Sequence, residues 1–487
     1  MKKMLIIPQI SCKSSKGEIL LENDSGMNLI LNMLDELTKE MNVTIAFPFN
    51  IEKMHNKVCD MFQCYNNLSF ISDCSHEYTD AKTERMNFHV SWYKYLKNVL
   101  GKIDYVFVAE PTQVVNIKAI FSDAYIITYN SWLAFKNMKE IHLRQFEGMC
   151  AADLTLVNSN YAKYEILKKY KDFDDITSLN IKKLPPAYNQ KIAFREQLKN
   201  KVDKLGIVYN HRLSSDEYYK NAYETFIEIV RQLELKFGED KMPDIYFTNP
   251  SGKEVELPNK KYIHIVDLKT QEEYINFLQS EKVQIHVNTF FKSEGMWAMS
   301  TVEAAITGNI CLLPKKYGYA EIFSDDYYGY CNCSKDLLVK LWEIIDQYSL
   351  FKAYNDRKLL NYHGNEIGRN FINMLNGFDC IRPWGNYHVL YYDKNKWVKV
   401  LKIKAGESLS LQKHKYRSES WDIRNGRCKI MINNIESNKS FGDTVRIPQG
   451  IWHNITAITD CLIIETAEGE LVHEDDIIRK SDKYGRE

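Results

Sequence analysis

The sequence predicts an α/β protein with two doubly wound, Rossmann-like parallel sheets, followed by an all-β barrel. Three observations carry this prediction. Apolar strands alternate with amphipathic helices in the first half of the chain, a second such series starts at Leu205, and short strands separated by Gly and Asn turns follow Cys380. The 487 residues exceed a single core, and we place three domains at 1–200, 201–379 and 380–487.

Composition narrows the classes of protein and partner. Lys plus Arg and Asp plus Glu each number 64, so no net charge attracts nucleic acid or a membrane surface. The 11 cysteines are scattered and contain no C-x-x-C pair, which favours reduced thiols over a disulfide framework. The chain start is too short for a signal peptide, and no apolar run reaches membrane-spanning length. We expect a cytoplasmic protein, in a host cytoplasm if a phage encodes it.

The first series opens with the buried strand "MLIIP" and a helix that Asp24 or Ser25 can cap. The strands "VTIAFPF", "YVFVAE", "YIITYN" and "LTLVNS" follow. Residues 182–204 are rich in basic side chains and contain two adjacent prolines. We interpret this segment as an interdomain linker, with contact to a polyanion as the less favoured alternative.

The second series begins with the strand "LGIVYN" and a long amphipathic helix that Gly238 ends. Thr270 and Glu273 have the spacing of a capping box at the start of a later helix. The run "VQIHVNTF", "AMSTVEAAITG" and "NICLLP" predicts another strand–helix–strand unit. Two doubly wound domains in tandem place a ligand cleft at the carboxyl ends of their strands.

Polar side chains interrupt the apolar strands of the C-terminal barrel. Gln412 and His414 are two residues apart and therefore share one face of a strand, with Glu419 close behind. His453 follows the turn at Gly450. Two imidazoles, one carboxylate and one amide suit zinc or another divalent cation. The alternative is a polar patch on a solvated strand.

Four stretches of the C-terminal region carry a resemblance. "IRPWGNYHVL", "LSLQKHKYRSESW", "IPQGIWHN" and "HEDDIIRKSDKYGR" resemble the cupin domain of type II mannose-6-phosphate isomerases over nearly all of residues 380–486. The resemblance implies a divalent metal, with zinc as the expected ion, on Gln412, His414, Glu419 and His453. It also implies that the sugar phosphate is held by Arg417, Arg479 and Arg486.

The chemistry of that family is aldose–ketose isomerisation, in which the metal polarises sugar oxygens. This chain has Ser420 where the family usually has a histidine. Isomerase turnover and a purely sugar-binding or structural role therefore both stay open. A homodimer formed through this domain is a further expectation.

Three stretches of the first two domains resemble GT-B glycosyltransferases of the retaining family-four kind: "VNSNYAKYEILKK", "YNHRLSSDEYYKNAYETF" and "EGMWAMSTVEAAITGNICLLP". The resemblance implies that Arg212 and Lys220 bind the donor diphosphate and act in catalysis with Glu294. The remaining donor contacts would come from Ser300, Thr301 and Glu303. Asn130 stands where family members often place a histidine, and would contact a sugar hydroxyl. No cofactor is expected in these two domains.

Together these features predict a glycosyltransferase that moves a sugar from a nucleotide diphosphate sugar to a hydroxyl, with a cupin that isomerises or binds a sugar phosphate. The acceptor stays open between a glycan and hydroxymethylated DNA. One alternative is a phage-type enzyme that glycosylates 5-hydroxymethylpyrimidine in DNA. Another is a scaffold in which only the cupin isomerase is active, or which only binds sugar.

Overall fold

A computed structural model of the chain divides into two compact units, Met1–Arg369 and Asn370–Glu487. The predicted domain boundaries at 200/201 and 379/380 stay predictions. No helix among the described residues is both long and apolar enough to cross a membrane. The structure describes residues 1–9, 25–51, 65–77, 89–130, 139–171, 179–189, 192–195, 198–199, 203–213, 217–248, 256–268, 270–292, 295, 297–351, 356–375, 380–382, 384–392, 395–470, 472, 476–481 and 483.

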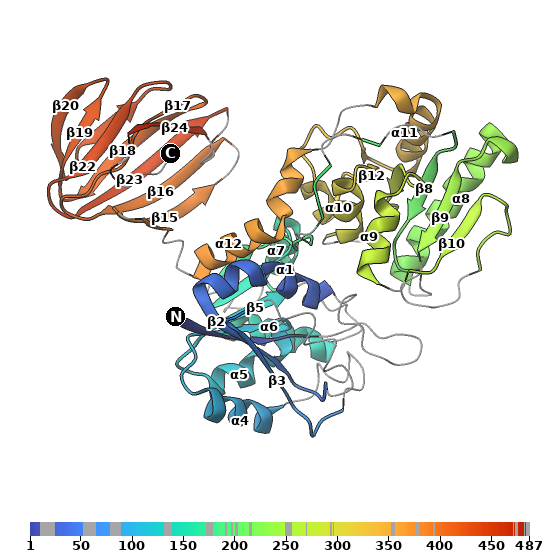
Figure 1. The fold of residues 1–487 in the computed structure, drawn as a ribbon, viewed down its shortest axis with the longest axis horizontal. Coiled ribbons are helices and arrows are strands. Elements are labelled where there is room, and N and C mark those ends of the chain that lie inside the picture. Colours follow the sequence, from blue (N-terminus) through green and yellow to red (C-terminus); the bar gives the residue numbers. More distant parts are fainter. Residues whose placement is uncertain are drawn as a thin grey trace. The chain divides into compact units, whose positions relative to one another are not determined.

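The first unit contains a seven-stranded parallel sheet with the order β3-β2-β1-β4-β5-β6-β7 (Figure 1). The order reverses between β1 and β4, which is the switch point of a doubly wound sheet. The strands are β1 Lys2–Ile7, β2 Met41–Phe47, β3 Leu68–Ser72, β4 Tyr105–Val108, β5 Tyr125–Asn130, β6 Leu154–Val157 and β7 Ile181–Lys183. The accompanying helices are α1 Ser25–Glu40, α4 Val90–Leu100, η3 Pro111–Gln113, α5 Val114–Ile120, α6 Lys139–Ala151 and α7 Asn160–Lys169.

A second parallel sheet in the same unit has the order β10-β9-β8-β11-β12-β13, with its switch point between β8 and β11. The strands are β8 Gly206–Tyr209, β9 Asp244–Thr248, β10 Ile263–Val266, β11 Ile285–Val287, β12 Ile310–Pro314 and β13 Tyr330–Cys331. The helices are α8 Glu217–Phe237, η5 Glu239–Lys241, α9 Gln271–Gln279, α10 Met299–Ile306, η6 Tyr317–Glu321, α11 Ser334–Gln347, η7 Tyr348–Leu350 and η8 Arg357–Tyr362. The next helix, α12 Gly364–Leu375, contains the boundary between the two units, and its first part packs against α1, where Gly364 and Gly368 approach Asn32 and Glu36.

Local signals in this second series are confirmed. Gly238 ends α8 with a φ of 78°, a left-handed conformation that glycine adopts without strain. Thr270 and Glu273 form the predicted capping box at the start of α9. The predicted α/β class with Rossmann-like parallel sheets is therefore confirmed for the first unit.

The linker interpretation of residues 182–204 is wrong for part of that segment. Lys182 and Lys183 lie in β7, and Leu198 and Lys199 are buried. The Lys199 ammonium donates to the carbonyl oxygens of Ser280 and Val283, at 3.0 and 2.7 Å. This lysine therefore joins the core of the second sheet, where burial lowers the pKa of its amine to about 7.

The second unit holds two antiparallel sheets, as the short strands and turns predicted. Their orders are β14-β15-β16-β23-β18-β21 and β20-β19-β22-β17-β24. Buried and exposed side chains alternate along the long strands, so each strand gives one face to the interior. The strands are β14 Cys380–Arg382, β15 Gly385–Tyr392, β16 Lys396–Ile403, β17 Leu411–His414, β18 Arg417–Asn425, β19 Arg427–Ile432, β20 Ile435–Ser440, β21 Thr444–Ile447, β22 His453–Ala457, β23 Cys461–Gly469 and β24 Ile477–Ser481.

Candidate functional site

The four predicted metal ligands converge inside the C-terminal barrel. Gln412 and His414 point inward from β17, Glu419 points inward from β18, and His453 begins β22. Gln412 and His453 are register partners of adjacent antiparallel strands. All four side chains are buried, and the strand alternation that predicted a shared face is confirmed.

The imidazoles lie on either side of the carboxylate. His414 Nε2 is 3.0 Å from Glu419 Oε1, and His453 Nε2 is 3.5 Å from Glu419 Oε2. The amide nitrogen of Gln412 is 3.5 Å from His414 Nε2, while its oxygen accepts a bond from Ser410. A half-turn of the amide exchanges its oxygen and nitrogen, so Gln412 can also offer an acceptor to this centre.

The pairing of His453 with Glu419 needs a cation. His453 Nδ1 lies 2.9 Å from the carbonyl oxygen of Ile451, a contact in which Nδ1–H is the donor. In a neutral imidazole this leaves Nε2 as a bare acceptor, facing a carboxylate oxygen that is also an acceptor. Among the described residues neither His453 Nε2 nor Glu419 Oε2 has a hydrogen-bond partner. A proton or a metal ion between these two atoms resolves the conflict.

The electrostatics of Glu419 favour the ionised form. Burial raises the pKa of its carboxyl, but the adjacent imidazoles of His414 and His453 and the charge of Arg417 outweigh this and hold the pKa well below its usual value. Arg417 is itself buried, and its Nε donates to Glu419 Oε1 at 3.0 Å. A fixed negative charge therefore stands at the centre of the cluster.

These residues fit a divalent metal. The ligand atoms of His414, Glu419 and His453 all lie within 4.8 Å of one another. Bonds of about 2.0–2.1 Å in a tetrahedral zinc site place neighbouring ligand atoms roughly 3.3 Å apart. The measured separations of 3.0 and 3.5 Å are of this size. The Nδ1 contact of His453 with Ile451 is the type of outer contact that orients a ligating imidazole.

A pocket that is open to solvent lies beside this cluster. Gln412, Arg417 and Glu419 line it, and so does Arg479 from β24. The Nε of Arg479 is buried and has no hydrogen-bond partner among the described residues. Arg417 forms ion pairs with Asp476 at 3.6 Å and with Glu419 at 3.0 Å, and so fixes the position of the Glu419 carboxylate. Arg486 lies outside the described residues, and its predicted contact with phosphate stays a prediction.

Ser420, the position that differs from the isomerase family, lies on the outward face of β18, opposite to Glu419. Arg417, Glu419 and Trp421 are buried, whereas Ser420 alternates with them and is paired with Arg446 on β21. Ser420 does not line the pocket. The missing imidazole therefore removes no group from the interior cluster, because position 420 faces outward.

Two charged side chains in the pocket were not predicted. Lys399 on β16 and Glu465 on β23 are each 5% exposed, and both line the pocket. The signal for both was present in the strand alternation. Lys399 lies on the same face of β16 as Trp397 and Leu401. A charged residue on such an apolar face is uncommon unless it has a function or a partner.

The predicted donor residues of the second sheet are only partly brought together. Arg212 is exposed and lies 5.6 Å from the ring of Tyr219. Lys220 is also exposed, and it forms an ordinary surface pair with Glu224 on α8 at 3.7 Å. Glu294 lies outside the described residues. A role in catalysis or donor binding stays a prediction for these residues.

The start of α10 instead gathers a buried polar cluster that was partly missed. Thr301 is fully buried and lies 2.9 Å from His286, so it points into the core. Ser300 lies 3.3 Å from His211, a second buried histidine. Burial lowers the pKa of His211 to about 3 and that of His286 well below its usual value. Both imidazoles are therefore neutral at ordinary pH.

Glu303 lies one turn further along α10. Its side chain is partly exposed, but burial of the carboxyl raises its pKa to about 7, while a bond to Tyr274 opposes the shift. The hydroxyl of Tyr274 in turn accepts a hydrogen bond of 2.7 Å from Asn210, the residue that directly follows β8. The carboxyl ends of β8 and β11 thus carry titratable groups at the switch point of the second sheet.

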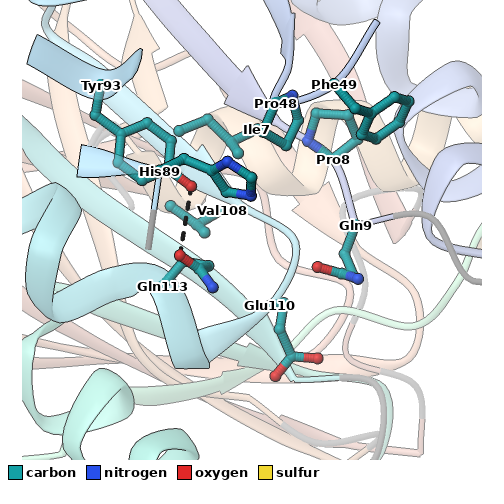
Figure 2. Close-up of a pocket in the computed structure, with 10 residues that line it drawn as sticks. All are labelled: Ile7, Pro8, Gln9, Pro48, Phe49, His89, Tyr93, Val108, Glu110 and Gln113. Atoms are coloured by element: carbon teal, nitrogen blue, oxygen red, sulfur yellow. Dashed lines mark hydrogen bonds between the residues drawn. The ribbon is translucent and has the colours of Figure 1, made fainter. Parts of the chain in front are cut away.

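A third candidate site lies at the switch point of the first sheet. A pocket there is lined by the ends of β1, β2 and β4. Figure 2 shows proline and aromatic side chains at one end and the polar ends of Gln9, Gln113 and Glu110 at the other. Tyr93 donates to Gln113 at 3.5 Å. Asn130 is buried beside Met149 and does not line this pocket, so its predicted contact with a sugar stays untested.

Comparison with known proteins bears most directly on the barrel. Residues 373–482 match the family model described as mannose-6-phosphate isomerase C-terminal. The second unit is therefore a cupin domain of the mannose-6-phosphate isomerase type. A solved cupin domain of Schizosaccharomyces pombe Cnp3 is 17% identical, covers 17% of this chain and 64% of that chain, and has a TM-score of 0.17.

Two curated relatives carry the same name, mannose-1-phosphate guanylyltransferase. The protein of Salmonella montevideo is 37% identical over 110 residues, which are 22% of this chain and 23% of that protein. The protein of Escherichia coli strain K12 is 25% identical over 296 residues, 56% of this chain and 59% of that one. The chain thus spans about a quarter of the first relative and less than two thirds of the second.

These names contradict the predicted function. They describe guanylyltransferases, which are nucleotidyltransferases, and they fit neither a glycosyltransferase nor a chain in which only an isomerase is active. The glycosyltransferase prediction is therefore wrong, together with its DNA-modifying and isomerase-only alternatives. The comparisons do support an enzyme of carbohydrate metabolism related to mannose phosphates.

Proposed function

We propose that this chain is an enzyme of mannose-phosphate metabolism whose cupin domain holds a divalent metal and binds a mannose phosphate beside it. The single observation that carries the proposal is the buried centre in which His453 Nε2 and Glu419 Oε2 face each other without a hydrogen-bond partner among the described residues. His414 completes the set, and Gln412 is in reach of it. Zinc is the ion that this mixture of nitrogen and oxygen ligands favours.

The pocket supplies the rest of the binding chemistry. A bound divalent metal would polarise sugar oxygens as a Lewis acid. Arg479 extends into the pocket from the strand paired with β17, and its guanidinium matches the geometry of phosphate. Arg417 keeps Glu419 oriented and ionised. Aromatic side chains of Trp384 and Trp397 form an apolar wall against which a sugar ring can lie.

The test measures metal and ligand separately on the purified full chain. Metal content is determined by mass spectrometry after zinc loading, and binding of mannose 6-phosphate is measured by calorimetry. We expect about one zinc per chain, and a loss of more than 100-fold in zinc affinity for His453→Ala, since loss of an outer contact alone costs about 10–100-fold. His264→Ala is the matched control, because His264 is a half-exposed histidine on β10. Equal zinc binding by both variants contradicts the proposal.

A second candidate activity is guanylyl transfer to mannose 1-phosphate. The specific observation in its favour is the 296-residue match to the Escherichia coli protein of that name, which extends well beyond the cupin. Doubly wound sheets bind nucleotides at their switch points, and both sheets of the first unit have such a point. Release of pyrophosphate from GTP that depends on mannose 1-phosphate tests this candidate. No release at enzyme concentrations near that of GTP excludes it.

A further inference from the structure

Lys399 and Glu465 form a polar row across the larger sheet of the cupin domain. Lys399 is the register partner of Glu465, and Glu465 is the register partner of Trp421 on its other side. All three side chains are buried on the inner face. Buried lysine and glutamate are rare in protein interiors unless they are paired or have a function, so this row needs an explanation.

The contacts of the two residues hold their charged groups in place within the pocket. The ammonium of Lys399 lies 3.4 Å from the ring centre of Trp397 and 4.4 Å from that of Tyr387. Glu465 Oε2 accepts a hydrogen bond of 3.1 Å from the indole of Trp421. Rigid aromatic groups therefore position both charges, an arrangement typical of a binding site.

The row lies next to the candidate metal centre. Glu419 pairs with Ala467, so Glu465 occupies the diagonal position two residues along β23. Diagonal neighbours on one face of a sheet are about 7–8 Å apart, close enough for one sugar to contact both residues. The pocket lining then carries three cationic side chains against two carboxylates, and a metal would add further positive charge.

We propose that Lys399 and Glu465 are the specificity-determining pair of this pocket and select a phosphorylated sugar over free phosphate. The inference rests on the proposed function and deepens it. The carboxylate of Glu465 can accept hydrogen bonds from several sugar hydroxyls, whereas the dianion of inorganic phosphate carries a single P–OH donor. The same carboxylate repels an anion that carries no hydroxyl-bearing sugar. Lys399 is the register partner of Glu465 and places a compensating positive charge in the buried row.

Calorimetry on the zinc-loaded full chain tests the pair with two probes, mannose 6-phosphate and inorganic phosphate. For Glu465→Gln we expect mannose 6-phosphate to bind at least tenfold more weakly, inorganic phosphate to bind as tightly as in the parent or more tightly, and zinc content to stay within twofold of the parent. Glu468→Gln is the matched control, since Glu468 lies on the same strand, is exposed, and pairs with Lys396 outside the pocket. This control should bind both probes as the parent does.

Each other outcome overturns the inference in a distinguishable way. An unchanged preference for mannose 6-phosphate in Glu465→Gln shows that the residue does not select the sugar. Parallel loss of zinc and of both probes shows that the row only supports the fold. A parent chain that binds zinc but neither probe refutes the proposed function itself. If Glu465→Gln does not fold, Lys399→Met tests the same pair, and the inference requires the same loss of preference.

Discussion

Among the described residues, two buried histidine clusters can be compared, and a carboxylate contacts the rings of one cluster but not those of the other. In the cupin, His414 and His453 lie on either side of Glu419, whose pKa is held well below its usual value. At the start of α10, His211 and His286 contact the hydroxyls of Ser300 and Thr301 instead. A carboxylate makes the first cluster a site for a cation, whereas the second cluster is stable with neutral rings.

The groups that face a buried histidine decide whether its site needs a positive charge. Where its partners are hydroxyls, the neutral ring can satisfy them, and burial merely lowers its pKa. Where two acceptors face each other, as His453 and Glu419 do, the structure needs a positive charge from outside the ring pair or from a proton. Four substitutions test this distinction between the two clusters.

The largest effect is expected for Glu419→Gln. The change removes the buried anion that balances Arg417, and loss of one partner from a buried ion pair costs about 3–5 kcal/mol. It also removes a metal ligand, so addition of zinc should no longer stabilise the variant. In the parent, zinc at 1,000 times its Kd should add about 4 kcal/mol. Urea unfolding followed by tryptophan fluorescence, with and without zinc, measures both effects.

An equal zinc-dependent gain in parent and variant would show that Glu419 is not a ligand. Ser420→Ala supplies the control on the same strand, because Ser420 lies on the outer face. It should unfold within about 0.5 kcal/mol of the parent, as surface changes usually do.

Much of this contrast could be predicted from residue spacing, and some could not. Gln412, His414, Glu419 and His453 were predictable because a strand repeats every two residues, and an imidazole or carboxylate is conspicuous on an apolar face. Lys399 was missed although it obeys the same rule, because it is one of three lysines in "VKVLKIK" and is as easily explained by an exposed face. Its burial depends on the neighbouring strands, which sequence spacing does not report.

The α/β half shows the limit of the same approach. The alternation of strands and helices followed from hydrophobic periodicity, and helix starts followed from capping signals such as the capping box at Thr270. The order of the strands within each sheet was not predicted. The side-chain predictions relied on motif order instead, and exposed Lys220 and fully buried Thr301 lie in very different environments. The activity could not be predicted in this way, because parallel sheets of this kind serve many chemistries.

The second-largest effect is expected for His211→Phe, in the pH dependence of the free energy of unfolding. The pKa of His211 is about 3 in the folded chain and near 6.5 when unfolded, so the unfolded state binds more protons below pH 6.5. The stabilisation is complete above pH 6.5 and is lost as the pH falls toward 3. Between pH 7 and 5 this amounts to about 2 kcal/mol. His211→Phe keeps a ring next to Tyr209 and Phe290 and should lose this part of the pH dependence. An unchanged profile in urea unfolding would contradict a neutral, buried His211.

Glu303 should show a smaller effect of the opposite sign. Its folded pKa is about 7, above the usual value of 4.5, so the folded state binds more protons between these values. The contribution of Glu303 to stability is therefore highest below pH 4.5 and falls as the pH rises through 7. Because the side chain is partly exposed, we expect a change of about 1–2 kcal/mol rather than the full shift. In Glu303→Gln the free energy of unfolding should change less between pH 4.5 and 7 than in the parent. An equal or steeper fall in the variant would show that another group is responsible.

Lys220→Ala should give the smallest effect and tests whether the first unit uses this lysine at all. Lys220 is exposed on α8 and pairs with Glu224 one turn away, and such pairs contribute about 0.3–0.5 kcal/mol. Glu224→Ala removes the same pair from the other side and should cost the same amount, because the two variants lose one shared interaction. Binding of GTP or of GDP-mannose, followed by fluorescence, should be equal in parent and both variants if the lysine is only a surface charge. A tenfold loss of nucleotide affinity in Lys220→Ala but not in Glu224→Ala would indicate that the ammonium of Lys220 contacts a phosphate. Loss of the surface pair alone would affect both variants equally.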